Sequence, residues 1–167
     1  MRAVLSIGSN LGDRLSHLQS VVDDLGARVR TVSPVYETDA WGGVEQDAFL
    51  NAVLIAEDPV LDGYGWLRRG QTVEAAARRV REVRWGPRTL DVDIICCHDD
   101  DGVELLCSES DLTLPHPHAH ERAFVLVPWL AADPDAVLSG TPVADLLAGL
   151  AVEERAGVRR TDLILAL

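Results

Sequence analysis

The chain has 167 residues, of which 47% are hydrophobic, so it has the size of one ordinary domain and can bury a core without disulfides. Its net charge of −12 argues against capture of nucleic acid or of an anionic membrane by the surface as a whole. All 15 basic residues are arginine, which excludes chemistry that needs a lysine amine, such as a P-loop lysine or a Schiff base.

Apolar runs are short throughout the chain. Those such as residues 124–132 are far below the roughly 20 residues that span a bilayer. The apolar stretch at the start is too brief for a signal peptide. We therefore expect a cytoplasmic protein with no membrane partner.

The first half of the chain alternates short apolar runs with one helical pattern. Leu15, Leu18, Val21, Val22 and Leu25 recur at helical spacing, and Gly26 would end that helix. A segment reaching about residue 79 is largely helical in pattern, although glycines interrupt it. Strands are predicted at residues 3–7, 29–37, 49–56 and 89–97.

This order, strand, helix, strand, strand, helix, strand, predicts an α+β fold with a ferredoxin-like βαββαβ core. We expect a mainly antiparallel sheet covered by helices in α/β/α layers, and one domain over residues 1–167. The remainder predicts a hairpin near 103–106 and helices near 124–130 and 143–150. Residues 159–161 and 163–167 form either a closing strand or a tail. Cys96, Cys97 and Cys107 are expected to be buried free thiols, with the adjacent pair on opposite faces of a strand.

Asp91 and Asp93 form the most informative pair of carboxylates. On a strand they project from the same face with Cα atoms about 6.5–7 Å apart, so a cation is expected between them. Hard oxygen ligands suit Mg²⁺, which completes its shell with phosphate oxygens and water. A bare Asp-x-Asp is more often a solvated polar face, so its context decides the interpretation.

Seven of the arginines lie between Arg68 and Arg88, directly before this pair. In an acidic chain they are typical of guanidinium clamps for a polyphosphate, although a helix-end charge cluster is the plainer alternative. Three histidines at alternate positions, His116, His118 and His120, favour phosphate contact over a zinc site, because no further ligand has suitable spacing nearby. Phe49 and Asn51 would share one face of their strand.

These segments together resemble the 6-hydroxymethyl-7,8-dihydropterin pyrophosphokinase family of folate biosynthesis. The resemblance covers roughly residues 3–135 in the family's order. Its segments are Trp85-Gly86-Pro87-Arg88-Thr89-Leu90-Asp91-Val92-Asp93-Ile94, Gly8-Ser9-Asn10-Leu11-Gly12, Phe49-Leu50-Asn51-Ala52, Leu114-Pro115-His116-Pro117 and Arg122-Ala123-Phe124.

The resemblance implies pyrophosphoryl transfer from ATP, the co-substrate, to the hydroxymethyl group of a reduced pterin, with release of AMP. It implies that Asp91 and Asp93 bind two Mg²⁺ ions and that Arg81, Arg88 and His116 act with them at the reaction centre. The residues implied at the pterin are Thr38, Trp41, Phe49, Asn51 and Phe124. Those implied at ATP are Gln71, Glu74, Arg81, Trp85, Arg88, Ile94, Thr113, His116 and Arg122. The loops at 38–47 and 78–88 would close over the substrates.

Two other functions remain open from the sequence. A different metal-dependent nucleotidyl or phosphoryl transferase would use the same Asp-x-Asp, and an RNA-binding ferredoxin-like module would use the arginine segment. The net charge and the low aromatic content of 5% weigh against RNA. We expect a monomer that binds small molecules and no nucleic acid.

Overall fold

A single sheet organises the computed structural model, which describes residues 1–39, 47–77 and 89–167. In the described residues this sheet has six strands in the order β10-β3-β4-β1-β5, with β2 also paired to β4, and every pairing is antiparallel. The mainly antiparallel sheet is confirmed. The strands are β1 (Arg2–Ser9), β2 (Val29–Val32), β3 (Tyr36–Thr38), β4 (Phe49–Glu57), β5 (Asp91–His98) and β10 (Val158–Arg160).

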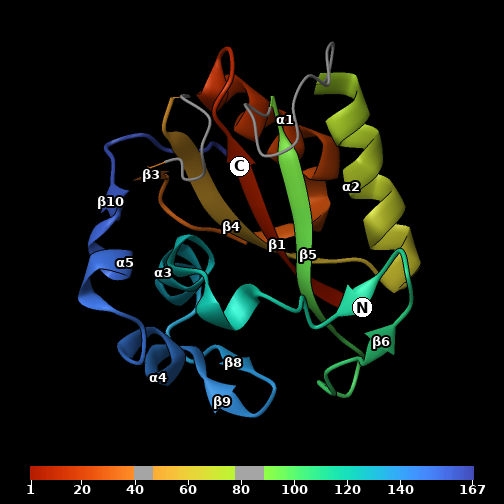
Figure 1. Cartoon of the computed structure of the whole chain (residues 1–167). Coiled ribbons are helices and arrows are strands. Elements are labelled where there is room, and N and C mark those ends of the chain that lie inside the picture. Colours follow the sequence, from red (N-terminus) through yellow and green to blue (C-terminus); the bar gives the residue numbers. More distant parts are fainter. Residues whose placement is uncertain (40–46, 78–88) are drawn as a thin grey trace.

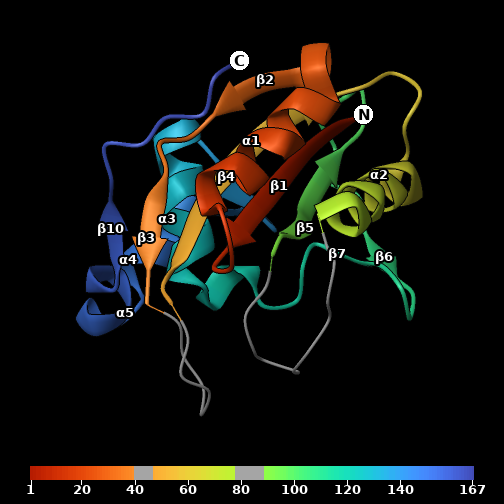
Figure 2. The same cartoon turned by 90° about the horizontal axis from the view of Figure 1, so that it is seen from above.

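Helices cover both faces of the sheet, which confirms the α/β/α layers (Figures 1 and 2). On one face α1 (Arg14–Leu25) and α2 (Gly63–Ala77) pack on Ala3, Leu5 and Ile7 of β1. On the other, α3 (Ala123–Ala132) packs on Val4 of β1 and on β4, and α4 (Val143–Ala148) and α5 (Val152–Ala156) lie against it. No helix in the described ranges is long and apolar enough to cross a membrane.

Helix α1 forms as its sequence predicts. The Asp13 side chain caps its start by accepting from the Ser16 N–H at 3.1 Å. The predicted apolar positions Leu18, Val21, Val22 and Leu25 are its buried residues. Gly26 ends the helix with a φ of +54°, a conformation that costs glycine little.

The predicted strand at 29–37 is interrupted in the structure, because Pro34 has no N–H to donate to a sheet. Strands β2 and β3 lie on either side, both paired with β4. At the break, Ser33 remains hydrogen-bonded to Val53 of β4. Its N–H donates to the Val53 carbonyl, and its Oγ accepts from the Val53 N–H, each at 2.9 Å. The Ser33 hydroxyl thus takes the place of a backbone carbonyl as the acceptor for the Val53 N–H.

The segments after β5 differ in part from the prediction. The prediction of a hairpin at 103–106 was wrong, because Glu104 there forms one isolated bridge with His98. The two-stranded ribbon lies later in the chain, where β6 (Cys107–Ser108) pairs with β7 (Thr113–Leu114). The helix near 124–130 is α3, and the one near 143–150 is α4, followed by α5. Short elements complete the described chain: η1 (Gly26–Arg28), η2 (Ala119–Glu121), β8 (Val137–Leu138) and β9 (Thr141–Pro142).

The end of the chain returns to the sheet. Strand β10 pairs with β3, and the last residues continue across α1 without regular structure. There Gln19 donates to the Ala166 carbonyl at 2.8 Å and accepts from the Ala166 N–H at 2.9 Å. Residues 163–167 are therefore a tail fastened to α1, while the closing strand lies just before them.

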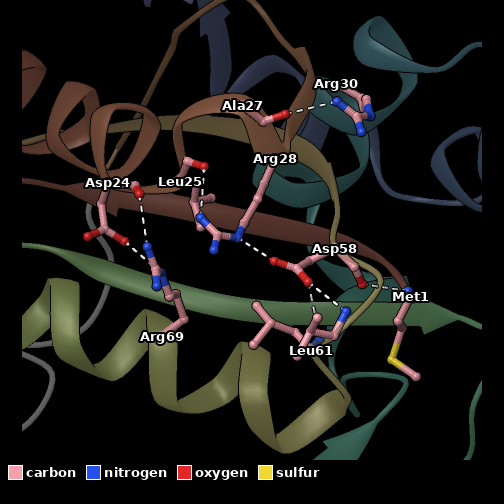
Figure 3. A network of polar contacts seen from close by, with 10 residues as sticks. Met1, Asp24, Leu25, Ala27, Arg28, Arg30, Asp58, Leu61 and Arg69 are labelled. Carbon is pink, nitrogen blue, oxygen red and sulfur yellow. Dashed lines mark hydrogen bonds and ion pairs between the residues drawn. The ribbon is translucent and has the colours of Figure 1, made fainter.

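Asp58 joins the start of β1 to the end of β4 (Figure 3). Its backbone exchanges hydrogen bonds with Met1, at 2.8 and 3.1 Å. Its carboxylate accepts from the Val60 N–H at 2.7 Å and from the Arg28 guanidinium. The Val60 hydrogen bond and Arg28 hold the pKa of Asp58 below its usual value. This carboxylate is therefore built into the fold in its charged form.

Asp58→Asn is expected to lower the thermal midpoint at pH 7 by a few degrees. Because the pKa is depressed in the folded state, the unfolded chain binds more protons as the pH falls. The difference from the unmodified protein should therefore shrink below pH 3.8, the usual aspartate value. Thermal unfolding from pH 7 to pH 2.5 measures this, with exposed Asp23→Asn as the control. A difference that stays constant with pH would contradict the assignment.

Ser33→Ala is expected to destabilise the protein by about 1–3 kcal/mol, because it leaves the buried Val53 N–H without its acceptor. Urea unfolding of both proteins gives the difference in the free energy of unfolding. Ser20→Ala is the matched control, since the Ser20 hydroxyl donates only to a carbonyl within its own helix. The interpretation fails if the two substitutions have equal effects.

Candidate active site

Neighbouring strands bring the predicted site residues into one row across the sheet. Asn51 on β4 is opposite Gly8 on β1, and Gly8 is opposite Asp91 on β5. Asp93 follows two residues later, opposite Ser6. Directly paired residues share a face, so Asn51, Asp91 and Asp93 lie on the face covered by α3. One intervening strand separates Asn51 from Asp91, a backbone spacing of about 10 Å.

The aromatic and amide side chains of β4 pack close to Gly8, which has no side chain in their way. A Cβ on Gly8 would lie 2.7 Å from Asn51 Nδ2 and 3.5 Å from Phe49 Cδ1. Thr38, at the end of β3, is opposite Phe49. Within the described ranges, the buried Asn51 Oδ1 and Thr38 Oγ1 have no hydrogen-bond partner. Buried polar atoms are normally paired, so these two fit a polar ligand that enters beside Phe49.

Asp93 meets the start of α3 through Arg122. The two side chains approach to 4.0 Å between Arg122 Nη1 and Asp93 Oδ2. The Arg122 guanidinium also lies over the Phe124 ring, 5.5 Å from its centroid. Desolvation raises the pKa of Asp93, and Arg122 opposes the rise. The Asp93 side chain is nevertheless 43% exposed, so its carboxylate is open to a ligand, and carboxylate oxygens are the donors that Mg²⁺ prefers. The donor set therefore fits the predicted metal.

Two candidate ATP residues are attached to the outer edge of β5. The Glu74 carboxylate accepts from the Val92 N–H at 2.9 Å, and the His116 N–H donates to the Ile95 carbonyl at 2.8 Å. Burial, followed by Arg122 and His118, lowers the pKa of His116 to about 4. The His118 N–H donates to His116 Nδ1 at 3.1 Å. The imidazole is therefore neutral near pH 7 and carries its proton on Nε2, where it is a donor.

Other predicted residues lie farther from this row. Gln71 is exposed on α2, and Thr113 is exposed on β7. Ile94 is buried in the core on the α1 and α2 side, opposite the face of Asp93, so only its backbone can meet a ligand beside Asp93. Their contacts with ATP remain predictions. Trp41, Arg81, Trp85 and Arg88, and most of both predicted closing loops, lie outside the described residues.

The three alternating histidines do not gather into a metal site in the described chain. His118 pairs instead with Glu121, at 2.8 Å between Nδ1 and Oε1. The group of metal-ligating side chains found in the described ranges is Cys96, His98 and Glu104, at the other end of β5. The cysteines are free, with Cys96 and Cys97 in the cores on opposite faces, as predicted; Cys107 is only partly buried.

Sequence reasoning missed the residues that hold the beginning of β4. Asn10 donates from its side chain to the Asp47 carbonyl at 3.0 Å, and Arg14 donates to the Ala48 carbonyl at 2.8 Å. Both contacts immediately precede Phe49 and fix the entry of the strand that carries it. The signal in the sequence was the asparagine within Gly8-Ser9-Asn10-Leu11-Gly12, a segment of the family resemblance to which no separate role was assigned, and the structure buries it.

Comparisons with known proteins agree with this arrangement. Residues 4–134 match the model of the 7,8-dihydro-6-hydroxymethylpterin-pyrophosphokinase (HPPK) family. A Mycobacterium leprae protein is 58% identical, with 99% of this chain and 92% of the relative covered. A Mycobacterium tuberculosis protein is 56% identical, over 95% and 88% respectively. Both relatives are named 2-amino-4-hydroxy-6-hydroxymethyldihydropteridine pyrophosphokinase.

A solved structure supports the fold independently. The wild-type HPPK-DHPS protein of Plasmodium falciparum superposes with a TM-score of 0.61 over 88% of this chain and 44% of that chain. Its sequence identity is 12%, so this likeness concerns the fold alone. Because the family model spans most of the chain and the mycobacterial relatives match it almost end to end, the chain belongs to the 7,8-dihydro-6-hydroxymethylpterin-pyrophosphokinase family.

Proposed function

We propose that this protein transfers the pyrophosphoryl group of ATP to the hydroxymethyl group of 6-hydroxymethyl-7,8-dihydropterin and releases AMP, as a step of folate biosynthesis. The observation that carries the proposal is the row across β4, β1 and β5 in a chain of this family. In this row an aromatic and an amide on β4 lie one strand away from a pair of carboxylates on β5. An acceptor heterocycle and a metal-bound triphosphate would therefore be neighbours.

The pterin is proposed to bind beside Phe49 and Asn51, next to Gly8. Phe49 and Phe124 would contact the two faces of its flat ring, and aromatic faces favour such stacking. Asn51 Oδ1 and Thr38 Oγ1 are the buried atoms that its polar groups would pair with. Trp41, outside the described residues, is proposed as a further contact. This placement leaves the hydroxymethyl group on the side toward β5.

The triphosphate is proposed to lie over Asp91 and Asp93, which would hold two Mg²⁺ ions. When bound, Mg²⁺ neutralises phosphate charge and favours in-line attack at the β-phosphorus. Arg122 and the Nε2–H of His116 would donate to phosphate oxygens. Glu74 fixes the start of β5 by accepting from Val92, and so positions the carboxylates. Arg81, Trp85 and Arg88 are proposed to bind ATP from the segment 78–88.

The reaction needs positioning and charge neutralisation more than proton transfer. In phosphoryl transfer the protein does little covalent work, and the described site supplies donors and carboxylates of that kind. Residues 1–167 are proposed to act as one domain and as a monomer, because described residues assigned to each substrate, such as Asn51 for the pterin and Asp91 for the triphosphate, lie on this one sheet.

Incubation with ATP, Mg²⁺ and 6-hydroxymethyl-7,8-dihydropterin tests the proposal. Chromatography should show AMP only when the pterin is present, in equal amount to a pyrophosphorylated pterin. Formation of ADP or of free pyrophosphate without pterin would point instead to another phosphoryl or nucleotidyl transferase. Salt-dependent RNA binding without turnover would favour the RNA-binding alternative.

Asp93→Ala is expected to lower kcat by on the order of 10²–10³-fold while the fold persists, because one metal ligand of the triphosphate is lost. Steady-state kinetics at saturating Mg²⁺ measure the loss, and thermal unfolding checks the fold. Asp101→Ala, an exposed aspartate in the turn after β5, is the control. Near-normal turnover at high Mg²⁺ would remove Asp93 from the site.

Gly8→Ala is expected to raise the KM for the pterin at least tenfold, because the new Cβ would meet the Asn51 amide at 2.7 Å and displace it. The KM for ATP should change little. Gly149→Ala, where a Cβ meets its nearest neighbour at an ordinary 3.5 Å, is the control. Equal changes in both KM values would show that the packing of Asn51 against Gly8 does not select the pterin.

A further inference from the structure

Cys96, His98 and Glu104 gather at the end of β5 far from Asp91. Cys96 and His98 are two residues apart and pair with Val4 and Arg2 of β1, so both point to the α3 face. Glu104 comes back beside them, since it forms an antiparallel bridge with His98. One ligand atom from each of the three side chains lies within 4.8 Å of the other two.

Each of the three side chains can offer a ligand atom to a metal ion. Cys96 is a free thiol with no exposed surface. His98 Nδ1 is buried and has no hydrogen-bond partner within the described ranges. Glu104 is held by the Ser139 N–H, at 3.0 Å to Oε2 and 3.4 Å to Oε1. A carboxylate has about four lone-pair sites, so Glu104 can accept from Ser139 and still bind a cation.

We propose that Cys96, His98 and Glu104 bind a structural Zn²⁺ ion, separate from the catalytic metal site. A thiolate, an imidazole and a carboxylate are ligands that Zn²⁺ accepts, whereas Mg²⁺ prefers oxygen ligands alone. Asp91 and His98 are at opposite ends of an eight-residue strand, about 23 Å apart, and the nearest members of the two sites, Asp93 and Cys96, are three residues or about 10 Å apart.

The geometry requires only small movements. Tetrahedral zinc, with bonds of about 2.0–2.3 Å, sets its ligand atoms about 3.5 Å apart, so the group must close by about 1 Å. Side-chain rotation supplies this. On binding, the Cys96 thiol loses its proton to solvent and forms the zinc–sulfur bond. His98 also lines a cleft of about 590 Å³, which offers an entry route on the His98 side of the group.

A zinc ion here would join three parts of the fold. Cys96 and His98 belong to β5, Glu104 to the segment after it, and Ser139 to the turn between β8 and β9. The connection after β5 otherwise depends on the short turn at Asp99, whose carboxylate accepts from Asp101 and Val103. Since zinc would bind the folded chain in preference to the unfolded one, it should raise the thermal midpoint.

Cobalt(II) titration of the reduced protein tests the site, because a bound thiolate gives a near-ultraviolet charge-transfer band that oxygen ligands do not give. Excess Mg²⁺ occupies oxygen-only sites during the titration. The band is expected in the unmodified protein and should disappear when Zn²⁺ is added. His98→Gln and Glu104→Gln are each expected to weaken cobalt binding at least tenfold, and Cys96→Ala to abolish the band.

Cys97→Ala is the matched control, because Cys97 is the adjacent buried thiol on the opposite face. It should keep both the band and the rise in thermal midpoint with zinc. The proposal is overturned if the unmodified protein gives no band at millimolar Co²⁺, or if Cys107→Ser removes it and Cys96→Ala does not. Should Cys96→Ala fail to fold, unchanged cobalt affinity in both His98→Gln and Glu104→Gln overturns it equally.

Discussion

The registers of β1 with its two neighbours are the constraint on which the rest of the structure depends. β1 pairs with β4 on one side and β5 on the other, and helices cover both of its faces. Ala3, Leu5 and Ile7 meet α1 and α2, while Val4 meets α3. A slip of one residue would exchange these two sets, so burial on both faces fixes the register strongly. Gly8 is thereby held between Asn51 and Asp91, and the two halves of the candidate site cannot shift relative to each other.

One irregularity in that register gives β5 two polar ends on the same face. The pairing shifts between Val4 and Leu5, so that Leu5 faces Ile94 while Val4 faces Cys96. In an unbroken strand, Asp91 and Asp93 would share their face with Cys97. The extra residue reverses the alternation and puts Cys96 and His98 there instead. Asp91, Asp93 and the proposed zinc ligands on β5 therefore belong to one strand and one face, although simple alternation would separate them.

Local patterns in the sequence predict the elements well and their long-range partners less well. The spacing of Leu18, Val21, Val22 and Leu25 is sufficient for α1, and the two-residue spacing of Asp91 and Asp93 is sufficient for a shared face. The break at Ser33 and the bulge in β5 depend on what lies opposite, which no local pattern contains. The same applies to Gly8, whose importance comes from Asn51 on another strand. His116 is placed by the Ile95 carbonyl, 21 residues away in the chain. The roles of the candidate site residues rest on family resemblance, because spacing alone does not specify a ligand.

The electrostatics of the site follow from an acidic chain that must hold an anion. With a net charge of −12, no general attraction brings a triphosphate to the surface, so local cations must do so. Arg122 is suited to this because its contact with Asp93, at 4.0 Å, is at the limit of an ion pair. Among the described residues, the Arg122 guanidinium also lies over the face of the Phe124 ring. Exchanging that weak pairing for phosphate oxygens costs little, and it leaves Asp93 to a metal ion. Desolvation raises the pKa of Asp93 even though 43% of its side chain is exposed, so a bound cation would favour the charged carboxylate.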